Sequence, residues 1–176
     1  MNSNLEKLLI IDFGSQFTQL IGRKLRELNV FSEIIPYQNL SKKTLENYNP
    51  KAVILSGGPS SVLGRKFPVP PSNLFDLGIP VLGICFGHQI IADALGGKVE
   101  KSHKGWGVGV HKYERKVNPE WSETIGDFFS GYVSHQDQVI VKPENAYTIY
   151  GSDFCPNSIL CYNDIRIYSM VIKKVE

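Results

Sequence analysis

Apolar runs and segments of helical periodicity alternate along the first half of the chain. Runs bounded by turn residues predict strands at 8–11, 30–35, 52–56 and 80–84. Apolar residues at helical spacing predict helices at 15–28 and 87–97, with shorter helices at 41–48 and near 72–77. Strands that alternate with helices are typical of a parallel sheet covered by helices. The first half therefore predicts an α/β fold with an open, mostly parallel sheet flanked by helices.

The pattern changes after residue 98, where short alternating or β-branched stretches follow one another with little helix between them. These stretches are 107–113, 131–134, 138–141, 147–151, 158–162 and 165–172. The C-terminal half is therefore expected to be rich in β-structure. No repeat, low-complexity tract or linker marks a boundary, so residues 1–176 are interpreted as a single domain.

The composition is that of a soluble globular domain that can bury one core, with 42% hydrophobic and 20% charged residues. The net charge of +2 is small, and the basic pairs are scattered among acidic neighbours. This argues against a nucleic-acid-binding face. The cysteines Cys85, Cys155 and Cys161 are odd in number and no two are spaced as CxxC, so neither a disulfide framework nor a metal site is expected.

The beginning of the chain does not resemble a secretory signal, because its short apolar run has an acidic residue on either side. No apolar stretch approaches the roughly 20 residues that a membrane helix needs. The expected location is therefore cytoplasmic, with no membrane as a partner.

The most informative local feature is GICFGHQ at 83–89, in which a predicted buried strand runs through Gly-x-Cys-x-Gly into a helix. Such a turn presents one side chain sharply at the carboxyl edge of a sheet. The helix N-terminus then favours the thiolate, which is the nucleophilic form of cysteine. The pattern predicts that Cys85 is a nucleophile, whereas Cys155 and Cys161 lack this context and are interpreted as buried structural cysteines.

A second glycine feature, LSGGPSSV at 55–62, directly follows the neighbouring predicted strand. A bare Gly-Gly-Pro can be only a turn. Its position at a strand end, however, predicts that its backbone N–H groups lie near Cys85. One N–H of Gly57 or Gly58, together with that of Phe86, could then stabilise a developing oxyanion.

Five ordered blocks carry a family resemblance: IDFGSQFTQLIGRKLRE, LSGGPSSV, PVLGICFGHQIIADALGGKVE, YVSHQDQV and DFCPNSIL. Together they resemble the class I glutamine amidotransferase domain of GMP synthases, over residues 7 to 168. The resemblance implies a flavodoxin-like fold and hydrolysis of L-glutamine to glutamate and ammonia through a cysteine thioester. It implies Cys85 as the nucleophile and Gly58 and Phe86 as oxyanion donors. The residues that it implies for glutamine binding are Gln89, Ser134, His135 and Asp137.

The sequence departs from the family near its end, where a strand reading YGxQFHPE is expected to supply a histidine base and the glutamate that orients it. Here Lys173 stands in place of the histidine and Val175 in place of the glutamate. Lysine, whose usual pKa is about 10.4, is a poor base at neutral pH. His135 is the candidate substitute base, although without the resemblance it reads equally well as part of a solvated loop. His88 is expected to point away from Cys85.

Three explanations of the departure remain open at this point: a degenerate paralogue, an altered final segment, or a base elsewhere in the chain. The second functional reading is a catalytically impaired binding module that keeps the fold. A third is an amidotransferase serving another acceptor. The resemblance implies a partner, the ATP-pyrophosphatase domain or subunit of a GMP synthase, which this chain does not contain and which would hold ATP and Mg. No phosphate loop, dinucleotide fingerprint or metal-ligand cluster is present, so no cofactor is expected in this chain.

Overall fold

The computed structural model describes residues 7–162, 166–171 and 173–174. Strands and helices alternate in the first half, as the sequence predicts. The strands are β1 (Leu8–Asp12), β2 (Ser32–Pro36), β3 (Ala52–Leu55) and β4 (Val81–Ile84). The helices are α1 (Thr18–Glu27), α2 (Lys42–Tyr48) and α3 (Phe86–Ala94), with 3₁₀ turns η1 (Tyr37–Asn39) and η2 (Leu74–Asp76).

The second half is mostly β-structure, again as predicted. Its strands are β5 (Lys98–Lys101), β6 (Gly107–Arg115), β7 (Phe128–His135), β8 (Asp137–Val141), β9 (Ala146–Gly151), β10 (Ile159–Tyr162), β11 (Ile167–Met170) and β12 (Lys173–Lys174), and η3 (Glu120–Ile125) is a 3₁₀ turn. The stretch expected at 165–172 contains β11, whereas β12 follows it and was not predicted; residues 163–165 and 172 lie outside the described ranges.

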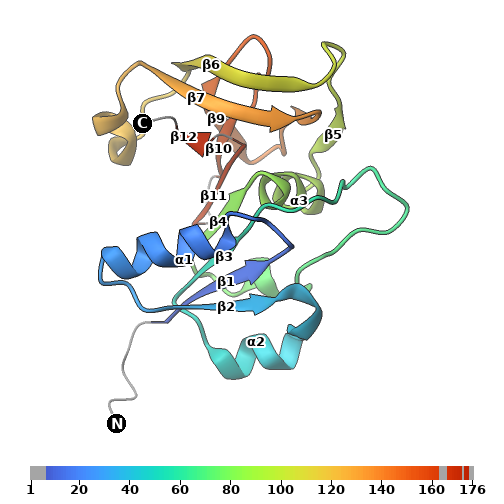
Figure 1. Ribbon diagram of the computed structural model, residues 1–176, viewed down its shortest axis with the longest axis vertical. Helices are drawn as coiled ribbons and strands as arrows, with labels where there is room; N and C mark the ends of the chain where they lie inside the picture. Colours follow the sequence, from blue (N-terminus) through green and yellow to red (C-terminus); the bar gives the residue numbers. More distant parts are fainter. Residues whose placement is uncertain (1–6, 163–165, 172, 175–176) are drawn as a thin grey trace.

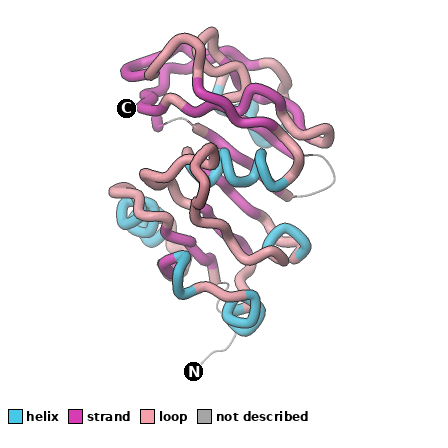
Figure 2. Tube along the Cα trace, turned by 90° about the vertical axis from the view of Figure 1, so that its right-hand side faces the viewer, coloured by secondary structure: helices cyan, strands magenta, loops and turns pink. Residues whose placement is uncertain are grey.

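One sheet runs through both halves in the order β12-β7-β6-β9-β10-β11-β4-β3-β1-β2. Its central strands β2, β1, β3, β4 and β11 are parallel, and the strands from β10 outward pair antiparallel. Figure 1 shows the parallel strands with α1 beside them, α2 below and the β-rich half above, and Figure 2 shows the same two parts from the side. The predicted α/β fold with a central, mostly parallel sheet is confirmed.

Helices lie on opposite faces of the parallel strands. Gly22 of α1 approaches Ile10 and Ile34, so α1 covers the face to which Ile10 points. Leu9 and Ile11 point to the other face and share a core with residues of α2 and α3. Alternation along β1 therefore fixes which helix covers which face, because successive side chains of a strand point in opposite directions.

Strand β5 was not among the predicted elements. It pairs antiparallel with β8 in a separate two-stranded sheet and buries only Val99 of its four residues. A four-residue strand with one buried apolar side chain carries too little alternation to be recognised. Helix α1 also begins later than predicted, at Thr18, because residues 13–17 form a turn that starts with the Gly14 N–H donating to Asp12 Oδ1 at 2.9 Å.

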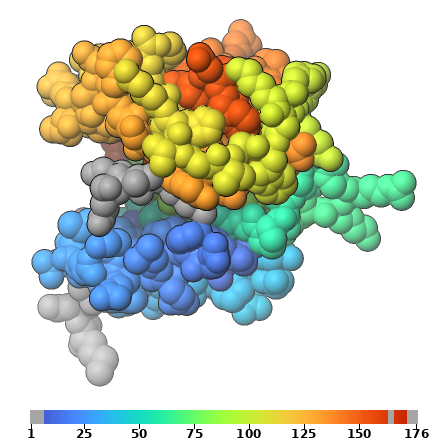
Figure 3. All heavy atoms as spheres, turned by 45° about the horizontal axis from the view of Figure 1, so that its top comes forward, coloured from blue at the N-terminus to red at the C-terminus, as the bar shows by residue number. Residues whose placement is uncertain are grey.

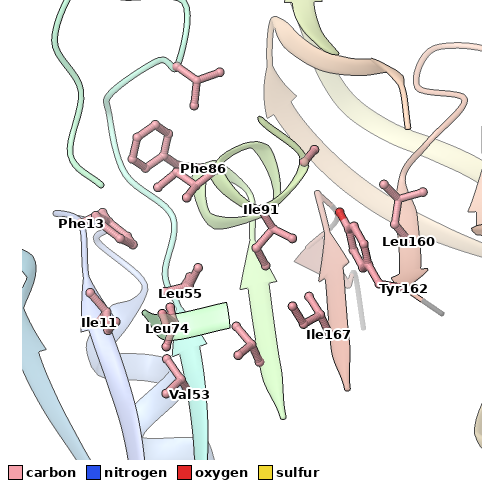
Figure 4. Close-up of a cluster of buried hydrophobic side chains, with 14 of the residues drawn as sticks. Ile11, Phe13, Val53, Leu55, Leu74, Phe86, Ile91, Leu160, Tyr162 and Ile167 are labelled. Atoms are coloured by element: carbon pink, nitrogen blue, oxygen red, sulfur yellow. The ribbon is translucent and has the colours of Figure 1, made fainter. Parts of the chain in front are cut away.

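Strand β10 connects two hydrophobic clusters because both of its faces are buried. Leu160 and Tyr162 face the larger cluster around the parallel strands and α3, which Figure 4 shows with Phe86, Ile91 and Ile167. Ile159 and Cys161 face the smaller cluster of the β-rich half. Figure 3 shows that the β-rich half, in yellow and orange, lies directly against the N-terminal half, in blue. The two halves are thus joined through a shared, packed interior.

None of the described helices is long and apolar enough to cross a membrane.

Replacing Leu160 by alanine tests how strongly this shared interior holds the fold. Leu160 is fully buried, so we expect Leu160→Ala to lower the free energy of unfolding by about 2–5 kcal/mol. Leu28, which is 72% exposed, provides the matched control, and Leu28→Ala should change it by less than about 0.5 kcal/mol. Urea unfolding followed by circular dichroism measures both. Equal losses in the two variants would contradict the assignment of β10 to the core.

Candidate functional site

Cys85 lies in a strained turn between β4 and α3. Its backbone has φ 53° and ψ −107°, a conformation that side chains rarely adopt and that costs on the order of 1–3 kcal/mol. The glycines beside it are required by close packing. A Cβ at Gly83 would lie 2.6 Å from the Gly87 carbonyl oxygen, and one at Gly87 would lie 2.4 Å from the Leu55 carbonyl oxygen. The predicted strand-to-helix turn is confirmed, with the helix starting one residue after the cysteine.

The Cys85 residue also contacts the end of β11. Its backbone N–H donates to the Met170 carbonyl at 2.8 Å. Its thiol lies 3.6 Å from the Val171 carbonyl oxygen, to which the S–H can donate. The nucleophile candidate is thus held between the start of α3 and the chain that follows β11, and the thiol remains partly exposed.

Gly58 and Phe86 lie beside Cys85 and carry the backbone N–H groups expected for an oxyanion site. Neither N–H has a hydrogen-bond partner among the described residues. Gly58 can only be glycine here, because a Cβ would lie 2.5 Å from the Phe13 carbonyl oxygen. At Gly57, in contrast, a Cβ would lie 3.4 Å from Cys85 Cβ, an ordinary contact distance. Both residues that the resemblance implies therefore have a free donor next to the thiol.

The loop that carries Gly58 is tied to the end of β1 by hydrogen bonds that the sequence analysis did not predict. Ser56 Oγ accepts from the Phe13 N–H at 3.0 Å and donates to the Gly57 carbonyl at 2.8 Å. Asp12 Oδ1 accepts from Thr18 Oγ1 at 2.7 Å. An acidic residue directly after a buried apolar strand is the sequence signal that could have indicated this network, which fixes two loops at one edge of the sheet.

A cavity of about 410 Å³ opens in front of the thiol. Its lining includes all seven residues that the sequence analysis assigned to the nucleophile, oxyanion and glutamine sites: Gly58, Cys85, Phe86, Gln89, Ser134, His135 and Asp137. Pro59, Ser60, Ser61, Lys101, Trp106 and Gln136 complete the lining. These residues come from four separate parts of the chain, so the fold brings the predicted set together at the carboxyl edge of β3 and β4.

Asp137 holds one wall of the cavity together. Its carbonyl oxygen accepts from Gln89 Nε2 at 3.2 Å and from His135 Nδ1 at 3.0 Å. Its carboxylate accepts a short hydrogen bond from the hydroxyl of Ser61. Asp137 therefore connects α3, the loop after β3 and the turn between β7 and β8. Ser61 was missed by the sequence analysis, although it stands three residues after Gly58.

His135 forms part of the cavity wall as a neutral imidazole. Its pKa is lowered, first by burial and also by the nearby His111, while the carbonyl and charge of Asp137 oppose the shift. Because Nδ1 donates to the Asp137 carbonyl, the lone pair lies on Nε2, which is shielded from solvent. The ring also packs 5.7 Å from Phe154. The neutral ring carries the lone pair that a base needs, the shielding of Nε2 and the lowered pKa reduce its accessibility and its basicity, and two contacts fix the ring.

His88 lies in the core rather than in the lining of the cavity. It is 1% exposed, and its Nδ1 is 2.7 Å from Ser169 Oγ on β11. Burial, aided by His135, lowers its pKa to about 3, so the ring is neutral. The expectation that His88 points away from the nucleophile agrees with this placement.

Of the two positions at which the sequence departs from the expected YGxQFHPE pattern, the structure describes only the backbone at Lys173. The backbone of Lys173 belongs to β12 and pairs with Tyr132 of β7, two residues before Ser134. Val175 lies outside the described residues. Position 173 thus follows the Val171 carbonyl by two residues, close along the chain to the contact with Cys85.

A larger cavity of about 750 Å³ lies in the β-rich half, between His111, Lys116, Phe128 and Asp153. None of the predicted site residues lines it. Among the residues that the structure describes, no group of three or more histidine, cysteine or acidic side chains is arranged to hold a metal ion.

Comparison with known proteins places the chain among amidotransferases. Residues 9–169 match the family model of glutamine amidotransferase class-I. A GMP synthase [glutamine-hydrolyzing] of Dinoroseobacter shibae is 58% identical over 162 residues, which cover 87% of this chain and 29% of the relative. The corresponding enzyme of Teredinibacter turnerae is 38% identical over 176 residues, covering 96% of this chain and 33% of the relative. The chain therefore spans about a third of the length of these two curated relatives.

Solved structures share the fold. The structure of a Thermoplasma acidophilum protein assigned as a GMP synthase subunit superposes with a TM-score of 0.78 at 23% identity, covering 97% of this chain and 85% of that one. A glutamine amidotransferase of Thermotoga maritima gives a TM-score of 0.75 at 20% identity, covering 96% and 76%.

The buried His88 generates a prediction on stability against pH. Its folded pKa of about 3 lies below the ordinary value of 6.5, so between these values the unfolded chain binds a proton that the folded chain excludes. Stability should therefore fall as the pH decreases from 6.5 towards 3, by about 1.4 kcal/mol per unit for this one group. In His88→Asn this contribution should disappear. Urea unfolding of both proteins at pH 7.0, 5.5 and 4.5 measures the difference, and parallel curves would contradict a neutral, buried His88.

Proposed function

The chain belongs to the class I glutamine amidotransferase family, and from this premise we propose that it hydrolyses L-glutamine to glutamate and ammonia through a thioester on Cys85. We propose further that the ammonia goes to a synthetase that makes GMP from XMP. The observation that carries the proposal is the cavity in front of Cys85, whose lining combines the strained nucleophile turn, two free backbone donors and the polar wall around Asp137.

Glutamine binds with its side-chain amide in this cavity, and the thiolate sulfur of Cys85 attacks the amide carbon. The carbon–nitrogen bond breaks after a proton reaches the nitrogen, and ammonia leaves. Water then attacks the thioester carbon and the carbon–sulfur bond breaks: the hydroxyl of the water becomes part of the glutamate carboxyl group, and its other proton goes to the sulfur, which regenerates the thiol. Gln89 and Ser134 contribute polar groups to the substrate side of the cavity, and the polar wall keeps its shape through Asp137.

The N–H groups of Gly58 and Phe86 donate hydrogen bonds to the carbonyl oxygen and stabilise the negative charge that develops on it in both tetrahedral intermediates. Such donors contribute about 10²- to 10³-fold in rate when they are fixed before the reaction begins. The packing of Gly58 against the Phe13 carbonyl supplies that rigidity here.

Proton transfer is the step for which this chain departs from its family. Lys173 and Val175 replace the histidine and glutamate, and a positioned base contributes roughly 10²- to 10⁴-fold. We propose His135 as the substitute base, since it is neutral and lines the cavity. The replaced pair favours a second candidate function, a binding module that keeps the glutamine cavity and turns over slowly. An amidotransferase serving another acceptor is a third.

The proposed partner is the ATP-pyrophosphatase domain or subunit of a GMP synthase, because the relatives that carry this name are about three times as long as the chain. ATP and Mg would act there, and this chain, as a single amidotransferase domain over residues 1–176, would need no cofactor of its own. A cytoplasmic location is part of the same proposal.

Glutamate release from glutamine tests the proposal, measured with and without the ATP-pyrophosphatase part of a GMP synthase. We expect Cys85→Ala to abolish the activity and Cys155→Ala, which removes a buried thiol away from the cavity, to retain it. The double variant Lys173→His, Val175→Glu should raise the rate about 10²-fold or more by supplying the base and its orienting carboxylate.

The pattern of activity separates the candidate functions. If the original chain releases glutamate through Cys85 and His135→Gln abolishes this activity, the result supports His135 as the substitute base. Release only after the repair supports the binding module. No release from the repaired chain with its partner present would overturn the glutaminase proposal.

A further inference from the structure

We propose that His88 is a positioning residue that locks the end of β11 onto the nucleophile turn, through its hydrogen bond to Ser169. The residue lies three positions after Cys85 in the first turn of α3, and Ser169 lies two positions before Val171. The inference deepens the proposed function, and it rests on that function for the identity of the substrate.

Three hydrogen bonds join the two segments side by side. The Cys85 N–H donates to the Met170 carbonyl at 2.8 Å, and the thiol lies 3.6 Å from the Val171 carbonyl oxygen. The third bond, between His88 Nδ1 and Ser169 Oγ at 2.7 Å, joins side chains. The first bond joins backbone groups alone, the second needs the Cys85 thiol, and the third is the bond of this set that joins two side chains other than the nucleophile.

The side-chain bond is built into the interior. His88 is 1% exposed and Ser169 is fully buried, so an unpaired partner would be left without water. Tyr162 Oη lies 3.3 Å from Ser169 Oγ and extends the contact to β10. If the tyrosine hydroxyl donates to Ser169, the serine proton is directed to His88 Nδ1. The two contacts of Ser169 therefore connect β11 to both α3 and β10.

This link matters for the chemistry because β11 has no other side-chain hydrogen bond to α3 among the described residues. Ser169 pairs in register with Gly83, over which α3 passes so closely that a Cβ would touch Ile91. With the link in place, a side-chain bond also fixes β11, and with it the Val171 carbonyl, relative to the thiol. Without it, the ladder with β4, the Cys85 N–H bond to Met170 and the Val171 N–H bond to Ser158 still hold the backbone, but no side-chain hydrogen bond among the described residues joins β11 to α3. A displacement of about 1 Å can cost 10²-fold in a reaction that depends on alignment.

Four variants test the proposal. Ser169→Ala and His88→Phe remove the bond, whereas His88→Asn keeps a polar group near the position of Nδ1. Ser158→Ala is the matched control, because Ser158 is equally buried and its hydroxyl donates to the Cys155 carbonyl, while its own backbone carbonyl, which accepts from the Val171 N–H, is kept in the variant.

The first measurement is amide hydrogen exchange of the peptides spanning 81–90 and 166–171, each relative to the peptide of β1. We expect exchange in both peptides to become at least tenfold faster in Ser169→Ala and His88→Phe. In His88→Asn and Ser158→Ala it should stay within about threefold of the original protein. Unchanged exchange in the first two variants, or equal acceleration in Ser158→Ala, would overturn the proposal.

The second measurement compares two reagents on Cys85: 6-diazo-5-oxo-L-norleucine, which is shaped like glutamine, and iodoacetamide, which is small and unselective. Removing the bond should slow the first reagent at least tenfold and change the second by less than about threefold, with recovery in His88→Asn. An unaltered ratio in a protein that reacts with both reagents would refute the positioning role. If the original protein reacts only with iodoacetamide, the proposed function fails, and the exchange experiment alone decides the role of His88.

Discussion

The close backbone approach of α3 to β3 and β4 is the constraint on which the rest of the site depends. It requires glycine at 83 and 87, since a Cβ at either position would lie within 2.7 Å of a backbone oxygen. The residue between them must then change the chain direction within one step, which places Cys85 at a positive φ. Strain at the nucleophile is therefore a result of helix packing, and the buried contacts of α3 compensate for its cost.

The same approach decides what surrounds the thiol. Because α3 begins at Phe86, the free N–H of that residue and the N–H of Gly58 on the neighbouring loop meet at one edge of the sheet. The opposite wall comes from the β-rich half, where the Asp137 carbonyl binds Gln89 and His135. The cavity thus requires both halves of the sheet, and β10, buried on both faces, holds those halves together.

The sequence predicted most of the elements and the residues of the cavity, for identifiable reasons. Gly-x-Cys-x-Gly and Gly-Gly-Pro are local signals of turns at strand ends, and parallel topology brings such ends together. Ser56 and Ser61 were not predicted, because their bonds to Phe13 and Asp137 join residues 43 and 76 positions apart, and Asp12 was not predicted because its bonds to Gly14 and Thr18 belong to an irregular turn. The strand β5 was missed because one buried valine in four residues leaves no pattern. Long-range polar contacts and short edge strands leave no mark on the spacing of apolar residues along the sequence, so they cannot be predicted from it.

In the proposed mechanism, the replaced positions 173 and 175 affect one part of the chemistry and leave another intact. Charge stabilisation depends on backbone groups of Gly58 and Phe86, whose positions follow from packing in the N-terminal half. Proton transfer depends on a side chain, and in this family that side chain comes from the segment after β11. The two functions are therefore carried by different parts of the fold, so one can be altered while the other remains. A thiol that is held beside an oxyanion site can react with a glutamine-shaped ligand before any proton is transferred to the leaving group. On the proposed mechanism, substrate capture is therefore separable from turnover.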